Sequence, residues 1–122
     1  MTITYEKAID LETDIIRIAK KLGFDYIDMS RVVCVRSYGS KARRTLARCH
    51  TISRIIQKAL NLKSHYVIEV ITENYDKLSD DDKTKVLIHE LMHIPKAFRG
   101  GFRHHDHVTD KNVNEMFRKL GS

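Results

Sequence analysis

HYVIEVIT, residues 65–72, is the clearest β-strand signal in the chain. Its β-branched and aromatic residues form a short apolar run, which is typical of a central or nearly central strand of a sheet. A second β-branched run, Val32-Val33-Cys34-Val35, predicts another strand over residues 29–37. This strand should end at the turn-forming residues Ser37-Tyr38-Gly39-Ser40. The sequence therefore predicts a sheet that contains residues 30–37 and 65–72.

Four segments show helical patterns. The first runs from Tyr5 to Leu22, with Thr4 as its cap and Gly23 as its stop, and the second follows an apolar stripe from Ala42 to Leu60. The third begins at Ser79-Asp80-Asp81-Asp82 and should run to about Ile94, because Pro95 removes a backbone donor. A last helix can be capped by Thr109-Asp110. We expect an α+β fold in which a small twisted sheet is backed by these helices.

Length and composition fit one soluble domain over residues 1–122. The chain has 42% hydrophobic and 31% charged residues, and no stretch approaches the roughly 18 apolar residues that a membrane span requires. We therefore expect no membrane partner. The N-terminus lacks a basic segment followed by an apolar run, so a cytoplasmic location is expected. Cys34 and Cys49 match no metal or redox spacing and are interpreted as reduced core residues.

The pentapeptide His89-Glu90-Leu91-Met92-His93 lies in the third predicted helix. Histidines at positions i and i+4 project from one face of a helix, so His89 and His93 can bind one zinc ion. Glu90 is rotated by about 100° from His89 and lies beside such an ion, where a general base is needed to take a proton from a metal-bound water. This pattern, H-E-x-x-H, predicts zinc-dependent peptide hydrolysis.

A catalytic zinc site commonly has three protein ligands, so a third ligand is expected downstream. His105 is the first choice, and Gly100 and Gly101 would let the chain return toward the helix. His104, His107 and, less favourably, Glu115 are alternatives, and Asp106 could orient a ligand imidazole. Tyr38, Tyr75 and Arg103 are candidates for stabilising an oxyanion.

The stretch from His89 to Pro95, followed by Phe98, Gly100-Gly101, Arg103 and His105, resembles the metallopeptidases found in archaea and phages, a group related to the SprT-like zincins. The strand at residues 66–70 also resembles the pattern of that family, and the similarity covers roughly residues 30 to 120. The resemblance implies a zincin-like domain with one zinc ion on His89, His93 and His105. It implies that Glu90 is the catalytic acid and base.

Basic residues are concentrated in one part of the chain. Nine of the 22 lysines and arginines lie between Asp28 and Glu69, where no acidic residue occurs. A basic surface favours phosphate contacts, so nucleic acid is a possible partner of segment 31–63, and a solvated surface is the competing interpretation. SprT-like relatives include proteases that act on DNA-bound proteins, which by resemblance is consistent with nucleic acid nearby.

Two other functions compete with the metallopeptidase hypothesis. The first is a nucleic-acid-binding module with a structural or vestigial metal site, which would use the basic segment alone. The second is a metal-dependent hydrolase of a non-peptide amide. Glu90 discriminates between an enzyme and a binding module, since only an enzyme requires this carboxylate.

Overall fold

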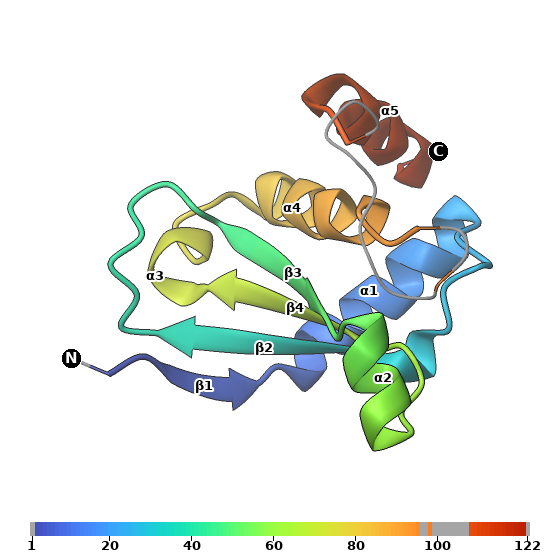
Figure 1. The fold of residues 1–122 in the computed structure, drawn as a ribbon. Coiled ribbons are helices and arrows are strands. Elements are labelled where there is room, and N and C mark those ends of the chain that lie inside the picture. Colours follow the sequence, from blue (N-terminus) through green and yellow to red (C-terminus); the bar gives the residue numbers. More distant parts are fainter. Residues whose placement is uncertain (1, 96–97, 99–107, 122) are drawn as a thin grey trace.

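A four-stranded mixed sheet organises the chain, with strand order β1-β2-β4-β3. The computed structural model describes residues 2–95, 98 and 108–121. Its helices and strands, in chain order, are β1 (Thr4–Lys7), α1 (Ile9–Leu22), the 3-10 turn η1 (Met29–Arg31), β2 (Val32–Tyr38), β3 (Ala47–Thr51), α2 (Arg54–Leu60), β4 (Tyr66–Ile71), α3 (Thr72–Tyr75), α4 (Asp80–Met92) and α5 (Asp110–Leu120). The fold is therefore α+β (Figure 1).

The central pair of strands is parallel. Val32 in β2 pairs with Tyr66 in β4, and this register continues to Ser37 and Ile71. The two outer strands are antiparallel to their neighbours: β1 pairs with β2, and β3 pairs with β4. The prediction of a central strand at residues 65–72 is confirmed, as is the strand within residues 29–37.

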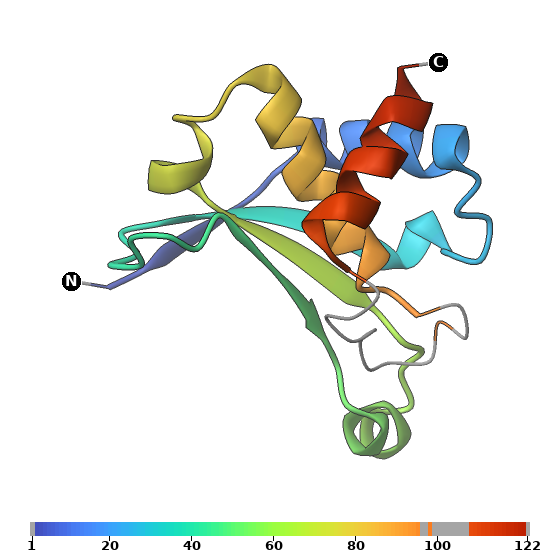
Figure 2. The same cartoon turned by 90° about the horizontal axis from the view of Figure 1, so that it is seen from above.

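Helices α1, α4 and α5 pack together on one face of the sheet (Figure 2). Side chains that are aligned across the three strands β2, β4 and β3 face these helices: Cys34, Ile68 and Cys49 form one such row. Helix α4 contacts both α1 and the edge strand β3. The core lies in this layer and includes Ile15, Ile18, Tyr66, Ile88 and Leu91, which are fully buried.

The expected helix start near Tyr5 is wrong, because residues 4–7 form β1. This short strand pairs with the free edge of β2, and the chain then turns at Ala8, whose N–H donates to the carbonyl oxygen of Cys34 at 2.9 Å. The apolar stripe of the segment is nevertheless helical from Ile9 onward. The predicted stop at Gly23 is confirmed, since this residue adopts φ 73°, which favours glycine.

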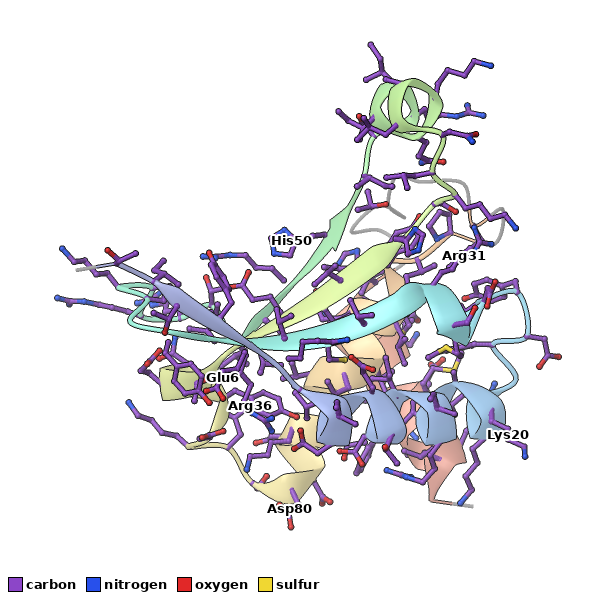
Figure 3. The ribbon with its side chains drawn as sticks, turned by 90° about the horizontal axis from the view of Figure 1, so that it is seen from below. Glu6, Lys20, Arg31, Arg36, His50 and Asp80 are labelled. Carbon is purple, nitrogen blue, oxygen red and sulfur yellow. The ribbon has the colours of Figure 1, made fainter. Side chains whose placement is uncertain are left out.

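The expected helix over residues 42–60 is also wrong. Residues 47–51 form the edge strand β3, and only Arg54–Leu60 is helical. In β3 the side chain of Cys49 packs against the core. Side chains alternate along a strand, so Arg48 and His50 face the opposite side, as Figure 3 shows for His50. There His50 Nε2 lies 2.7 Å from the carboxylate of Glu69, which is only 5% exposed. As a strand paired with β4, the segment packs Cys49 into the core on one face and places Arg48 and His50 beside Glu69 on the other. These contacts outweigh the helical spacing of its apolar residues.

The remaining two predicted helices are confirmed. Ser79 caps α4 by accepting a hydrogen bond from the N–H of Asp82, and Thr109 caps α5 in the same way through Asn112. Helix α4 ends at Met92, two residues before the predicted end. None of the helices in the described ranges is both long and apolar enough to cross a membrane.

Candidate metal centre

Two imidazoles meet at the C-terminal end of α4. His89 lies in its last turn, and His93 is the capping residue, which keeps helical angles of φ −71° and ψ −18°. The i and i+4 relation therefore holds, and the Nε2 atoms of the two rings lie 3.2 Å apart. Two nitrogens bound tetrahedrally to one zinc ion at 2.0–2.1 Å would be separated by about 3.3 Å. The two side chains consequently fit a shared zinc ion.

Glu90 places a carboxylate beside this pair. Its Oε2 lies 3.8 Å from Nε2 of His89, and the residue is only 6% exposed. Burial disfavours the charged form and raises the pKa of Glu90 from its ordinary value of 4.5 to about 7. A carboxylate with a pKa near neutrality can both accept and release a proton at physiological pH.

A cavity of about 540 Å³ adjoins His89 and Glu90. One wall includes Leu46, which precedes β3, and another includes Val113 of α5. Sequence analysis missed these wall residues, because Leu46 was assigned to a helix and nothing in the sequence brings residues 46, 89 and 113 together. The cavity gives a substrate direct access to His89 and Glu90.

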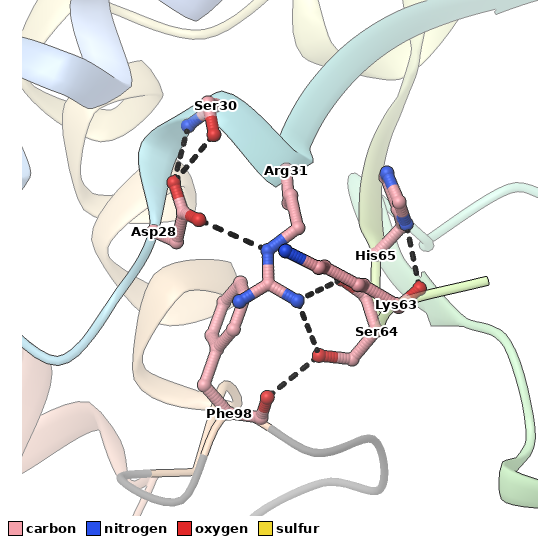
Figure 4. A network of polar contacts seen from close by, with 7 residues as sticks. All are labelled: Asp28, Ser30, Arg31, Lys63, Ser64, His65 and Phe98. Atoms are coloured by element: carbon pink, nitrogen blue, oxygen red, sulfur yellow. Dashed lines mark hydrogen bonds and ion pairs between the residues drawn. The ribbon is translucent and has the colours of Figure 1, made fainter. Parts of the chain in front are cut away.

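The chain that leaves α4 is fixed at Phe98 (Figure 4). This residue is 7% exposed, and the Arg31 guanidinium lies 4.8 Å from the centroid of its ring. The Ser64 hydroxyl donates to the carbonyl oxygen of Phe98 at 2.6 Å, and Arg31 in turn donates to the carbonyl and hydroxyl oxygens of Ser64. These contacts fix the main chain at Phe98 itself.

The residues expected to complete the metal site lie in two places in the chain. His104, His105 and His107, together with Asp106 and Arg103, lie outside the described residues. Glu115 is exposed on α5. Within the described ranges, no group of three or more histidine, cysteine, aspartate or glutamate side chains could hold a metal ion.

The candidate oxyanion residues Tyr38 and Tyr75 do not line the cavity beside His89. Tyr75 is 3% exposed and lines a different cavity together with Asp10 and Arg36. Its burial raises the pKa of the phenol to about 12. The structure thus gives no support for Tyr75 as a group that acts beside His89.

The two cysteines are free thiols, as expected, and lie on opposite sides of Ile68 in the sheet. One intervening strand separates them by about 10 Å, which is too far for a disulfide. Burial raises the pKa of both thiols, and for Cys49 the neighbouring Glu90 carboxylate is a further cause.

The basic segment divides into paired and exposed charges. Arg31, Arg36 and Arg48 each lie within 4.0 Å of a carboxylate. The other six are exposed and form no ion pair within the described residues: Lys41, Arg43, Arg44, Arg54, Lys58 and Lys63. They form two groups, one in the loop before β3 and one on or after α2, which lie at opposite ends of β3 (Figure 1).

A helix that carries two neighbouring imidazoles and a buried carboxylate, with His89 and Glu90 lining a cavity, is typical of metal-dependent hydrolases. The family model described as "Putative phage metallopeptidase" matches residues 3–120. The chain therefore belongs to this metallopeptidase family, which indicates a hydrolase that uses a metal ion and acts on peptide or protein substrates. No curated protein and no solved structure gives a significant match.

Proposed function

We propose that the chain is a zinc-dependent metallopeptidase of zincin-like architecture, with residues 1–122 forming a single catalytic domain. The observation that carries the proposal is the 3.2 Å separation of the His89 and His93 Nε2 atoms, with the Glu90 carboxylate at 3.8 Å from the first of them. The relation to SprT-like zincins is part of this proposal. It is consistent with the family match over residues 3–120.

In this mechanism His89 and His93 present neutral imidazole nitrogens to the metal. A bound zinc ion supplies a Lewis acid and a water molecule of lowered pKa. Glu90 accepts a proton from the attacking water and delivers it to the leaving amine. Its burial beside His89 suits this role, because the carboxylate is held next to the metal position and away from bulk water.

His105 is proposed as the third ligand, with His104 and His107 as the alternatives. It follows the anchored residue Phe98 by seven positions. The contacts of Phe98 with Ser64 and Arg31 anchor the chain there, so the loop that must close to bring a downstream ligand to the helix is counted from Phe98, and a shorter loop loses less entropy on closure.

An extended substrate is proposed to align with β3. This strand forms an edge of the sheet, and α4 contacts it. An edge strand offers backbone N–H and C=O groups that an incoming polypeptide can pair with, which would place a peptide bond near His89 and Glu90.

The direct test combines metal analysis with a protease assay. Glu90→Gln should abolish hydrolysis of an unfolded protein substrate while zinc content stays near one ion per chain. His89→Ala and His93→Ala should each lower zinc content, whereas the matched control His65→Ala, at an exposed histidine, should not. Full hydrolysis by the Glu90 variant, or unchanged zinc content in the His89 and His93 variants, would refute the proposal.

A second candidate function is nucleic-acid binding, alone or combined with proteolysis. The six exposed basic residues that form no ion pair in the described part of the chain support it. Fluorescence anisotropy with single- and double-stranded DNA should show affinity that falls with salt, and Arg54→Glu with Lys58→Glu should weaken it. A salt-independent or absent signal would remove this candidate. A protein that binds DNA but hydrolyses neither peptides nor other amides would instead be a binding module.

A further inference from the structure

The cavity beside His89 continues as a groove along α4. Asp82, Val86 and His89 line it together, and these positions follow the i, i+4 and i+7 spacing of one helical face. With a rise of 1.5 Å per residue, about 10 Å separate residues 82 and 89 along the helix. Roughly three residues of an extended polypeptide span that length.

Part of the lining of this groove is aliphatic. Leu46 and Ala47 come from the start of β3 and the residue before it, Leu78 and Val86 from α4 and the turn before it, and Val113 from α5. Leu46 and Val86 are only partly buried, so apolar surface is available to a ligand.

Glu90 is the buried acidic residue of the groove and lies next to His89, whereas the other charged residues of the lining are exposed or partly exposed. Arg44, Asp82 and Asp110 are exposed. The ammonium group of Lys85 lies 4.9 Å from the centroid of the Phe117 ring on α5, so it is held against that helix. A charged ligand side chain placed among Leu46, Val86 and Val113 would lose hydration without an opposite charge beside it.

We propose that this groove binds one large apolar side chain of the substrate, next to the peptide bond that is cleaved, and so sets a sequence preference. The inference rests on the proposed peptidase function and adds to it a substrate class. Pairing of the substrate with β3 alone would recognise its backbone and give little sequence preference. The groove, by contrast, distinguishes substrates by the side chain that enters it. A volume of about 540 Å³ is within the range of ligand sites, so leucine, methionine and phenylalanine all fit.

The expected preference is measurable. Differences in apolar fit within a pocket change kcat/KM by roughly 10- to 200-fold. We therefore expect cleavage beside leucine or phenylalanine to exceed cleavage beside glycine or aspartate by at least about tenfold. Val86→Phe or Leu46→Phe would fill the groove and shift the preference toward small side chains.

The experiment digests a mixed peptide pool with the zinc-loaded protein and maps the cleaved bonds by mass spectrometry. The two groove variants are compared with Ile55→Phe, the same type of change at a residue on α2 that is 76% exposed and does not line the groove. Circular dichroism checks that each variant is folded. Wild type and the Ile55 variant should share one apolar preference, and both groove variants should lose it.

A second measurement does not depend on activity. The metal-free, isotope-labelled protein is titrated with N-acetyl-leucinamide and, separately, with N-acetyl-aspartamide. Amide resonances of Leu46, Val86 and Val113 should shift with the first compound only. Cleavage without side-chain preference, or no shift with leucinamide, would overturn the groove while leaving the peptidase proposal intact. A wild-type protein that cleaves no peptide would instead refute the peptidase proposal and, with it, the substrate assignment.

Discussion

The buried carboxyl of Glu90 should make the metal-free protein lose stability as the pH rises. Below pH 4.5 this carboxyl is protonated in both the folded and the unfolded chain, so it contributes no pH dependence. Between pH 4.5 and about 7 the unfolded chain releases the proton while the folded chain retains it, which favours unfolding. At about 1.4 kcal/mol per pH unit, the shift from 4.5 to about 7 corresponds to roughly 3 kcal/mol above pH 7.

Glu90→Gln removes this penalty, because the amide has nearly the same shape and carries no charge at any pH. Urea unfolding in the presence of EDTA, followed by circular dichroism at pH 4.5, 6, 7 and 8, measures both proteins. The variant should match wild type near pH 4.5 and exceed its free energy of unfolding by about 3 kcal/mol at pH 8.

The matched control is Glu115→Gln, at an exposed glutamate on α5, which should differ from wild type by less than about 0.5 kcal/mol at every pH. A difference between Glu90→Gln and wild type that stays constant across the pH series would refute the reasoning. A variant less stable than wild type at pH 8 would do the same, since it would mean that the ionised carboxylate stabilises the fold.

Three further predictions concern the scaffold. Ser79→Ala removes the N-terminal cap of α4 and should lower the free energy of unfolding by about 1 kcal/mol in urea titrations. Ser79→Thr should stay close to wild type, and equal stability of all three proteins would contradict the capping role. Arg36 donates two hydrogen bonds of 2.7 Å to Asp10 and lowers the pKa of that carboxyl, so the stabilisation is present above its ordinary pKa and is lost as the pH falls through the lowered value. Because Asp10 is largely exposed, Asp10→Asn should cost no more than about 1 kcal/mol at pH 7 and progressively less as the pH falls into the acid range, and a larger loss in acid than at neutral pH would be inconsistent with this ion pair. Burial raises the pKa of the thiols of Cys34 and Cys49, which makes them poor nucleophiles in the folded protein. A colorimetric thiol reagent at pH 8 should therefore react slowly with the folded protein and quickly in urea. Fast reaction of the folded protein would show that these side chains are accessible.

Local chemistry made the candidate metal helix predictable. Ser79 caps it, the three aspartates that follow interact with the positive end of the helix dipole, and Pro95 prevents its continuation. Each of these signals acts within one or two turns. The positions of His89 and His93 on one face follow directly once the segment is helical.

The edge strands were not predictable, because their conformation depends on distant partners. The segment around Cys49 has apolar residues at helical spacing, yet it gains backbone pairing with β4 and a carboxylate, Glu69, for Arg48 and His50. That carboxylate lies about 20 positions further along the chain. The spacing of apolar residues within a short stretch of sequence gives no information about such a distant partner.

The site was predictable only in part for the same reason. His89, Glu90 and His93 are close in sequence, and the structure brings their side chains together as expected. The groove is built from Leu46, Val86 and Val113, which belong to three different segments. The choice of His105 stays a prediction, since this residue lies outside the described ranges.

The parallel pairing of β2 with β4 has a consequence for synthesis of the chain in the cell. Residues 32–37 of β2 each pair with a residue 34 positions later, as Val32 does with Tyr66. At translation rates of about 5–20 residues per second, the ribosome adds β4 roughly two to seven seconds after β2. For that interval the nascent chain carries an apolar strand whose central neighbour does not yet exist. Aggregation or chaperone capture during translation should therefore depend on β2 more than on the helix that bears His89, which is made after both strands.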